Sequence, residues 1–494
     1  MSRRWWGLLE LQQLEEMATE LIWLDNGTIE WFYSGDIMTD VQKVRTDVDN
    51  ETFWRAVGLD IERHDDLMKG LPPIFQSVFL GQQNRPRGIA YYDSFIQDLH
   101  GKRPKEVFDR KNNGDKVIGA FCAFFPEEFV HAAGAVPLIL CGGAEFPIAD
   151  AEKILPRNTC PLIKSSFGFK ISNLCPYFQS ADLLVGETTC GGKKKMYELL
   201  GEYVPTYVLH LPHKKNDEIS RNLWFEEVKK FKGIVEDLTG RKITDEKLRA
   251  AIDLANRKRL ALARVYNTRK ADPVPISGKD VLLVMQLALF DDAERFVKKT
   301  NELAEELEAR VKRGEGVAPK GAPRVLISGT PMTIPNWKVH DTIEKSGAVV
   351  VTEESCTGTR YFTDLVDTKD ASSSDDLILR MAEKYLHINC ACFTPNEERI
   401  EDVVRLAREY NADGVVYYVL QFCHEFNTEY AKIERALRTE GIPVIKIETD
   451  YSDSDRGQLK TRIETFVEML KASKARGAAS LAEEGGIKAS VSGS

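Results

Sequence analysis

The chain has 494 residues, and its 67 Lys and Arg against 76 Asp and Glu give a net charge of −9. Hydrophobic residues make up 43% and charged residues 29% of the chain, which excludes a disordered or collagen-like protein. No apolar run reaches the roughly 18 residues of a membrane helix, and Glu10, Glu15 and Glu16 interrupt any signal-peptide core. The acidic balance provides no broad basic surface for nucleic acid. We therefore expect a cytoplasmic protein of about three domains, with neither nucleic acid nor membrane as partner.

Residues 1–110 are predicted to form a mainly helical N-terminal extension. Short amphipathic patterns, such as those at 8–14 and 75–80, indicate helices. The segment has no cysteine and holds five of the seven tryptophans, Trp5, Trp6, Trp23, Trp31 and Trp54. We expect it to serve packing or the association of protomers.

Strands and helices alternate over residues 111–313, which we interpret as a first α/β domain. Short buried strands are predicted at 116–121, 136–140, 182–185 and 207–211. A helix is expected to begin at Pro126, and longer helices at 217–238, 244–267 and 278–312. The last is rich in Glu and Lys, which is typical of a surface or connecting helix.

A second alternating unit is predicted at 324–472, after a Gly- and Pro-rich linker at 314–323. Its strands are expected at 324–328, 348–352, 414–420 and 443–447. Its helices are expected at 336–346, 376–388, 397–410, 425–440 and 455–472. Apolar strands alternating with helices indicate parallel sheets covered on both faces. Residues 473–494 are expected to be a flexible tail.

The cysteines carry the strongest signal for a functional site. Five of the nine come shortly after predicted strands, namely Cys122, Cys141, Cys190, Cys356 and Cys423. Ligands of α/β sheets bind beyond the carboxyl ends of the strands. Thiols from two domains could therefore meet across a cleft, whereas buried core thiols would be scattered over helices and strand interiors.

The cysteine spacing favours iron–sulfur ligation over zinc. Zinc ribbons and fingers use local Cys-x2-Cys pairs, and the only close pair here is Cys390-Ala-Cys392. Thiols separated by long gaps with little histidine are typical of iron–sulfur sites. We interpret His131 and His424, which lie near cysteines, as packed or neighbouring residues rather than ligands.

Two nucleotide-binding patterns are excluded. The loop from Gly186 to Lys195 resembles a P-loop, but Lys194 stands where the magnesium-binding hydroxyl is required. No Gly-x-Gly-x-x-Gly fingerprint follows a strand, which excludes a typical nicotinamide dehydrogenase. The glycines of the loop could still let backbone N–H groups approach a cluster or an anion. Its three lysines could meet an acidic partner or a phosphate, or form a solvated helix end.

Motifs in both halves resemble the 2-hydroxyacyl-CoA dehydratase / benzoyl-CoA reductase family. In the first half these are residues 121–137 (Phe-Cys-Ala-Phe-Phe-Pro-Glu-Glu and following), 155–166, 175–178 and 188–196. In the second half they are residues 354–360, 390–396, 422–424 and 448–453. The resemblance covers about 115–470 and excludes the N-terminal extension. One departure is Gly191, where the family usually has Asp.

The resemblance implies two Rossmann-like domains with an iron–sulfur cluster in the cleft between them. It also implies a separate ATP-hydrolysing iron–sulfur activator protein that delivers low-potential electrons. The three cysteines that hold a single 4Fe-4S cluster in dehydratase subunits match Cys160, Cys190 and Cys423. With Cys122, Cys356 and Cys390 added, the set resembles the double-cubane subgroup, in which six thiolates hold two 4Fe-4S units joined by a bridging sulfide. Members of that subgroup are homodimers.

The remaining cysteines and the polar neighbours complete the expected site. Cys175 and Cys392 are alternative ligands, and Cys141 resembles a buried structural thiol. Proton delivery or tuning of the cluster is assigned to Glu127, Lys164, Ser165 and His424. Glu128 is a further candidate, and for Glu128 and Lys164 a solvated surface position is the alternative.

Three functions follow. The first is an activator-dependent iron–sulfur reductase of a small molecule bound in the interdomain cleft. The second is a 2-hydroxyacyl-CoA dehydratase subunit that carries one 4Fe-4S cluster and pairs with a different subunit. The third is a non-catalytic electron carrier.

Overall fold

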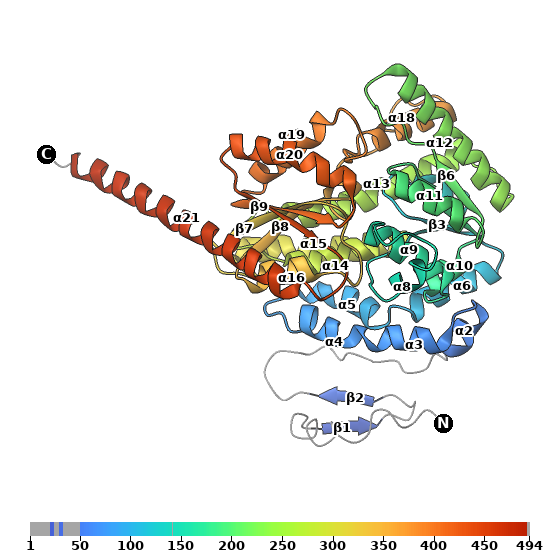
Figure 1. Ribbon diagram of the computed structural model, residues 1–494, viewed down its shortest axis with the longest axis horizontal. Coiled ribbons are helices and arrows are strands. Elements are labelled where there is room, and N and C mark those ends of the chain that lie inside the picture. The colour runs from blue at the N-terminus through green and yellow to red at the C-terminus, as the bar shows by residue number, and fades with distance from the viewer. Residues whose placement is uncertain (1–19, 24–28, 33–49, 141, 492–494) are drawn as a thin grey trace. The chain divides into compact units, whose positions relative to one another are not determined.

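The computed structural model describes residues 20–23, 29–32, 50–140 and 142–491 (Figure 1). The chain divides into two compact units, Met1–Phe53 and Trp54–Ser494. In the first unit, β1 (Glu20–Trp23) pairs antiparallel with β2 (Ile29–Phe32). This hairpin is an exception within the mainly helical extension expected for residues 1–110, and its β-branched and aromatic residues favour strands. Trp5 and Trp6 lie outside the described residues.

Helices occupy the chain from Asn50 to Asn112, as expected for the rest of the N-terminal extension. The Asp60 side chain begins one of them, because it accepts a hydrogen bond from the Arg63 backbone N–H at 3.2 Å. The helices in order are α2 (Asn50–Ala56), α3 (Ile61–Lys69), α4 (Leu71–Phe75), the π-helical η1 (Gln76–Leu80), the 3-10 helical η2 (Arg87–Ile89), α5 (Ala90–Gln97) and α6 (Lys102–Asn112).

The first sheet has four parallel strands in the order β4-β3-β5-β6. Its strands are β3 (Val117–Ala120), β4 (Val136–Ile139), β5 (Leu183–Glu187) and β6 (Thr206–Leu209). Helices between them are α7 (Glu127–Ala132), α8 (Ile148–Ala151), α9 (Pro161–Ile171), α10 (Pro176–Ser180) and α11 (Gly191–Leu200). Every residue of β3 and β5 is buried, which explains why both strands are apolar apart from Glu187 at the end of β5.

The second sheet is also four-stranded and parallel, in the order β10-β9-β7-β8. Its strands are β7 (Arg324–Gly329), β8 (Val349–Glu354), β9 (Gly414–Leu420) and β10 (Val444–Thr449). Its helices are α16 (Lys338–Lys345), α17 (Thr359–Phe362), α18 (Ser374–Leu386), α19 (Glu397–Glu409), α20 (His424–Thr439) and α21 (Arg456–Val491). Two parallel sheets with intervening helices confirm the predicted α/β class.

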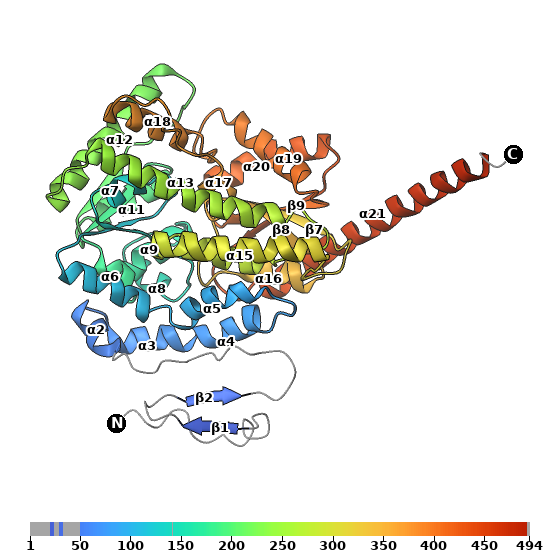
Figure 2. The ribbon, with the colours of Figure 1, turned by 180° about the vertical axis from the view of Figure 1, so that it is seen from behind.

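Four long helices join the two sheets, α12 (Glu218–Thr239), α13 (Asp245–Thr268), α14 (Gly278–Ala288) and α15 (Ala293–Arg313). Figure 2 shows α13 and α15 running side by side. The prediction of a single helix at 278–312 is wrong, because residues 289–292 separate two helices there, α14 and α15. The Asp292 side chain accepts a hydrogen bond from the Arg295 N–H at 3.0 Å and so starts a new helix.

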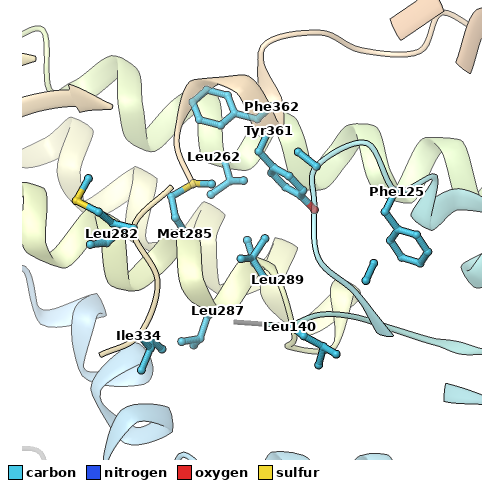
Figure 3. Close-up of a cluster of buried hydrophobic side chains, with 14 of the residues drawn as sticks. Phe125, Leu140, Leu262, Leu282, Met285, Leu287, Leu289, Ile334, Tyr361 and Phe362 are labelled. Carbon is cyan, nitrogen blue, oxygen red and sulfur yellow. The ribbon is translucent and has the colours of Figure 1, made fainter. Parts of the chain in front are cut away.

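Helix α14 is a central core element rather than a surface helix, because all of its residues are buried. Figure 3 shows its side chains Leu282, Met285 and Leu287 in one cluster with residues of both halves. Leu140 comes from the segment after β4, and Tyr361 comes from α17. The two sheets therefore share one continuous hydrophobic core.

Helix α21 continues to Val491, so the expected loose tail from residue 473 is helical. Alanine is frequent in this stretch and has the highest helix propensity. The domain boundaries at 110, 313 and 472 stay predictions. Among the described residues, no helix combines the length and apolar character that spanning a membrane requires.

Candidate functional site

A cavity of about 380 Å³ lies beyond the carboxyl ends of strands from both sheets. Its lining includes residues that follow β3, β4, β5, β7, β8 and β9. Seven cysteines line it, Cys122, Cys160, Cys190, Cys356, Cys390, Cys392 and Cys423. All six cysteines proposed from sequence as ligands therefore face one cavity.

Short connections between strands and helices present these thiols. Cys190 ends the loop after β5 and caps α11, with its sulfur accepting the Lys193 N–H at 3.3 Å. Cys160 precedes Pro161, the first residue of α9, and Cys423 precedes α20. Helix N-termini direct N–H groups and a positive partial charge toward these sulfurs, which stabilises thiolates.

The thiols fall into two sets, and each set takes members from both halves of the chain. In the first set, the thiols of Cys160 and Cys423 interact with each other, and Cys190 interacts with Cys160. In the second set, the thiol of Cys122 interacts with that of Cys356, and the thiol of Cys390 with that of Cys392. Cys392 also lies within electrostatic range of Cys122 and Cys356.

The thiols differ in their pKa values because their surroundings differ. The hydrogen bond from Cys122, together with the positive charges of Arg360 and Lys193, lowers the pKa of Cys356 to about 6 against the effect of burial. Arg360 Nη1 lies 3.9 Å from Cys356 Sγ. Burial raises the pKa of Cys190 to about 11. The second set therefore contains a thiol that is largely ionised at neutral pH.

The seven thiols around the cavity are the donor type that iron–sulfur clusters use. Among the described residues, no three His, Cys, Asp or Glu side chains form a group that could hold one metal ion. A single zinc ion requires thiolates about 2.3 Å from a common centre. An iron–sulfur cluster binds its cysteines through several irons, so its thiolates surround a volume instead of a point.

One described cysteine is not part of this arrangement. Cys175 is buried at the start of α10 and does not line the cavity. Cys141 lies outside the described residues.

Glu127 lies behind the cavity wall, not in its lining. Its carboxylate pairs with Lys258 Nζ at 2.8 Å and accepts the Tyr361 hydroxyl at 2.7 Å. Burial alone would raise its pKa, but the charges of Lys258, His131 and Arg259 lower the pKa of Glu127 to about 2. It is therefore ionised and fixed at neutral pH, which does not suit a proton donor.

Glu128, Lys164 and Ser165 are buried and lie outside the cavity lining. Glu128 binds Arg259 at 2.6 Å, and Lys164 binds Glu152 at 2.8 Å. Both are buried outside the cavity lining, so the solvated-surface alternative is wrong for Glu128 and Lys164. Ser165 is buried and accepts the Ala144 N–H at 3.3 Å.

His424 is the only one of the four predicted catalytic side chains in the cavity lining. It is exposed at the first residue of α20.

Sequence reasoning missed three polar residues beside the thiols. Lys193 and Tyr361 line the cavity, and Arg360 contacts Cys356 from behind. Lys193 was visible as the first lysine of the Gly-Gly-Lys-Lys-Lys run, but only helix geometry separates it from its exposed neighbours. A Cβ atom added at Gly191, where the family usually has Asp, would meet nothing within 4 Å.

Comparison with known proteins identifies relatives over most of the chain. The family described as "2-hydroxyglutaryl-CoA dehydratase, D-component" matches residues 122–470. YjiM of Escherichia coli (strain K12), whose name describes it as a dehydratase subunit, is 42% identical over 74% of this chain and 94% of its own length. The (R)-phenyllactyl-CoA dehydratase beta subunit of Clostridium sporogenes is 23% identical over 76% of this chain and 99% of its own. One component of the benzoyl-CoA reductase of Thauera aromatica is 23% identical over 78% of this chain and 98% of its own.

The family match covers well over half of the chain, and the match to YjiM covers almost all of that relative. The resemblance read from the motifs is confirmed at the level of the family. The chain belongs to the family of the 2-hydroxyglutaryl-CoA dehydratase D-component.

Proposed function

We propose that the protein is a cytoplasmic iron–sulfur reductase of the double-cubane type. It receives low-potential electrons from an ATP-dependent activator protein and reduces a small molecule at the cavity between the two α/β halves. The observation that carries this proposal is the lining of one cavity by two sets of cysteines, each drawn from both halves.

Six cysteines would hold the cofactor. Cys160, Cys190 and Cys423 would bind one 4Fe-4S unit, and Cys122, Cys356 and Cys390 would bind the other. When bound, such a cofactor supplies electrons of low potential, and the protein tunes that potential through charge, hydrogen bonds and burial.

The apolar part of the cavity lining supports a small substrate with little charge. It includes the apolar side chains of Leu140, Leu162 and Leu289. Thr333, also in the lining, has a buried hydroxyl without a hydrogen-bond partner among the described residues. A charged group would lose solvation against such a wall, whereas a small ligand could use the hydroxyl. The cofactor would occupy part of the 380 Å³, which leaves limited room for substrate.

A second candidate is a dehydratase subunit with a single 4Fe-4S cluster. The names of the relatives favour it, since several are beta subunits of acyl-CoA dehydratases. On this proposal only Cys160, Cys190 and Cys423 would bind iron, and activity would require a different partner subunit.

Iron and sulfide analysis of anaerobically purified protein distinguishes the two candidates. The double-cubane proposal predicts about eight iron per chain, and the dehydratase proposal about four. Size-exclusion chromatography with light scattering should give a homodimer that is complete without a second subunit. An iron content near zero would overturn both proposals.

The activator requirement has its own test. Electron transfer to the reductase should require the ATP-hydrolysing activator, and a non-hydrolysable ATP analogue should abolish it. Cluster reduction without any substrate turnover would point to an electron carrier instead.

A further inference from the structure

We propose that Lys193 is a positioning residue whose single positive charge stabilises added negative charge on both thiol sets and so raises the reduction potential of the cofactor they hold. The inference rests on the proposed function and assigns a role that the two thiol sets alone do not explain.

Lys193 is placed by the first turn of α11. Its backbone N–H donates to Cys190 Sγ at 3.3 Å, and its side chain lines the cavity. Its ammonium forms an ion pair with Glu187 and lies 5.9 Å from the centre of the Tyr197 ring. Its side chain is only 13% exposed.

The next two lysines of the run do not share this position. Lys194 and Lys195 are exposed, and Lys195 pairs with Glu198 on the same helix. One lysine of the three is therefore directed into the site, while its neighbours offer the same chemistry in solvent.

Lys193 lines the cavity together with the cysteines of both sets. Its ammonium is the cation of the Gly-Gly-Lys-Lys-Lys run that is held at this cavity, through the ion pair with Glu187. A cation in a buried site stabilises negative charge on the groups around it.

Other charged residues beside the thiols are tied to one set. The Arg360 guanidinium lies 3.9 Å from Cys356 Sγ of the second set. Glu425 follows Cys423 of the first set by two residues, in the first turn of α20. Lys193 lines the cavity that the cysteines of both sets share.

Glu187 holds this cation in place and offsets part of its charge. Its carboxylate is 98% buried and also accepts the Thr189 hydroxyl at 2.8 Å and the Tyr197 hydroxyl at 3.1 Å. Reduction adds an electron to a buried site that already carries thiolates, and a nearby cation stabilises that electron. Removing Lys193 should therefore lower the potential, and neutralising Glu187 should raise it.

The test is an anaerobic redox titration with dithionite, followed by EPR, on wild-type protein and four variants. Lys193→Met should lower the equilibrium constant for reduction at least tenfold, which is about 59 mV for a one-electron couple. Lys193→Arg should keep the wild-type value, and Lys194→Met is the matched control in the same helical turn. Glu187→Gln should shift the potential in the opposite direction.

The outcomes separate this inference from the proposed function. Wild-type protein without iron would overturn the proposed function itself. Wild-type protein with iron, and equal potentials in Lys193→Met and Lys194→Met, would overturn only the role of Lys193. Loss of iron in Lys193→Met but not in Lys193→Arg would support the need for a cation there. Loss of iron in both Lys193→Met and Lys193→Arg, with full iron content in Lys194→Met, would mean that the shape of the side chain matters rather than its charge. That result would contradict the inference.

Discussion

The Tyr361 hydroxyl donates a hydrogen bond of 2.7 Å to Glu127 Oε1 behind the thiol cavity. Tyr361 belongs to the second α/β half and Glu127 to the first, so the bond ties the halves together where the cysteines of both meet. Lys258 on α13 completes the group through its own contact with Glu127 at 2.8 Å. The carboxylate holds the site together, although its sequence position near Cys122 indicated proton transfer.

Replacing Glu127 with Gln should destabilise the protein by on the order of 3 kcal/mol near pH 7, because Lys258 then loses a buried partner. The pKa of Glu127 is about 2 in the folded protein, below its ordinary value of 4.5. Its contribution is therefore fully present above about pH 4.5 and disappears as the pH falls toward 2.

Urea unfolding of wild type and variant at several pH values measures this difference. Glu226→Gln, an exposed carboxylate on α12, is the control. A difference that stays constant between pH 7 and pH 3 would contradict the assignment.

Replacing one cysteine of a set should remove the iron that this set binds and leave the iron of the other set. Cys190→Ala should lose about half of the iron, since it removes one ligand of one four-iron unit. Cys356→Ala should lose the other half. Cys175→Ala should keep the full content, because Cys175 does not line the cavity. Iron analysis after anaerobic purification gives the result, and a full content in Cys356→Ala would contradict a second unit.

Cys390 and Cys392 present a choice that variants can resolve. Both line the cavity, and their thiols interact with each other. We expect Cys390→Ala to lower the iron content and Cys392→Ala to leave it unchanged. The reverse result would make Cys392 the iron ligand in place of Cys390 and would leave the other five proposed ligands unchanged.

The metal-free protein should show unequal thiol reactivity. Cys356, with its pKa near 6, should be alkylated by iodoacetamide readily at pH 7, whereas Cys190, with its pKa near 11, should react slowly until the pH rises well above 9. Both are partly exposed, so access alone does not predict this order. Mass spectrometry of tryptic peptides after short exposure provides the comparison. Equal rates at pH 7 would contradict it.

Strand positions could be predicted well because buried parallel strands appear as short apolar runs. All eight predicted strands of the two sheets are present, and four of the cysteines after them, Cys122, Cys190, Cys356 and Cys423, line one cavity. The break between α14 and α15 was missed because the helical pattern continues through it, and only the Asp292 cap interrupts the helix. The β1–β2 hairpin was missed because the aromatic residues of the extension also suit amphipathic helices.

Side-chain roles could be predicted less well than thiol positions. A cysteine in the short connection after a strand lies near the end of the sheet, but the long side chains of Glu127 and Lys164 reach partners outside their own helices. Lys258, the partner of Glu127, is 131 residues away. Lys193 is partly buried at the cavity whereas Lys194 and Lys195 are exposed, and only the orientation of α11 in the structure shows this difference.

Anomalous diffraction at the iron edge, from crystals grown without oxygen, tests the central claim most directly. The account predicts two groups of iron peaks in the cavity, one beside Cys160, Cys190 and Cys423 and the other beside Cys122, Cys356 and Cys390. A single group at the first three cysteines, or no iron peak in the cavity, would contradict it.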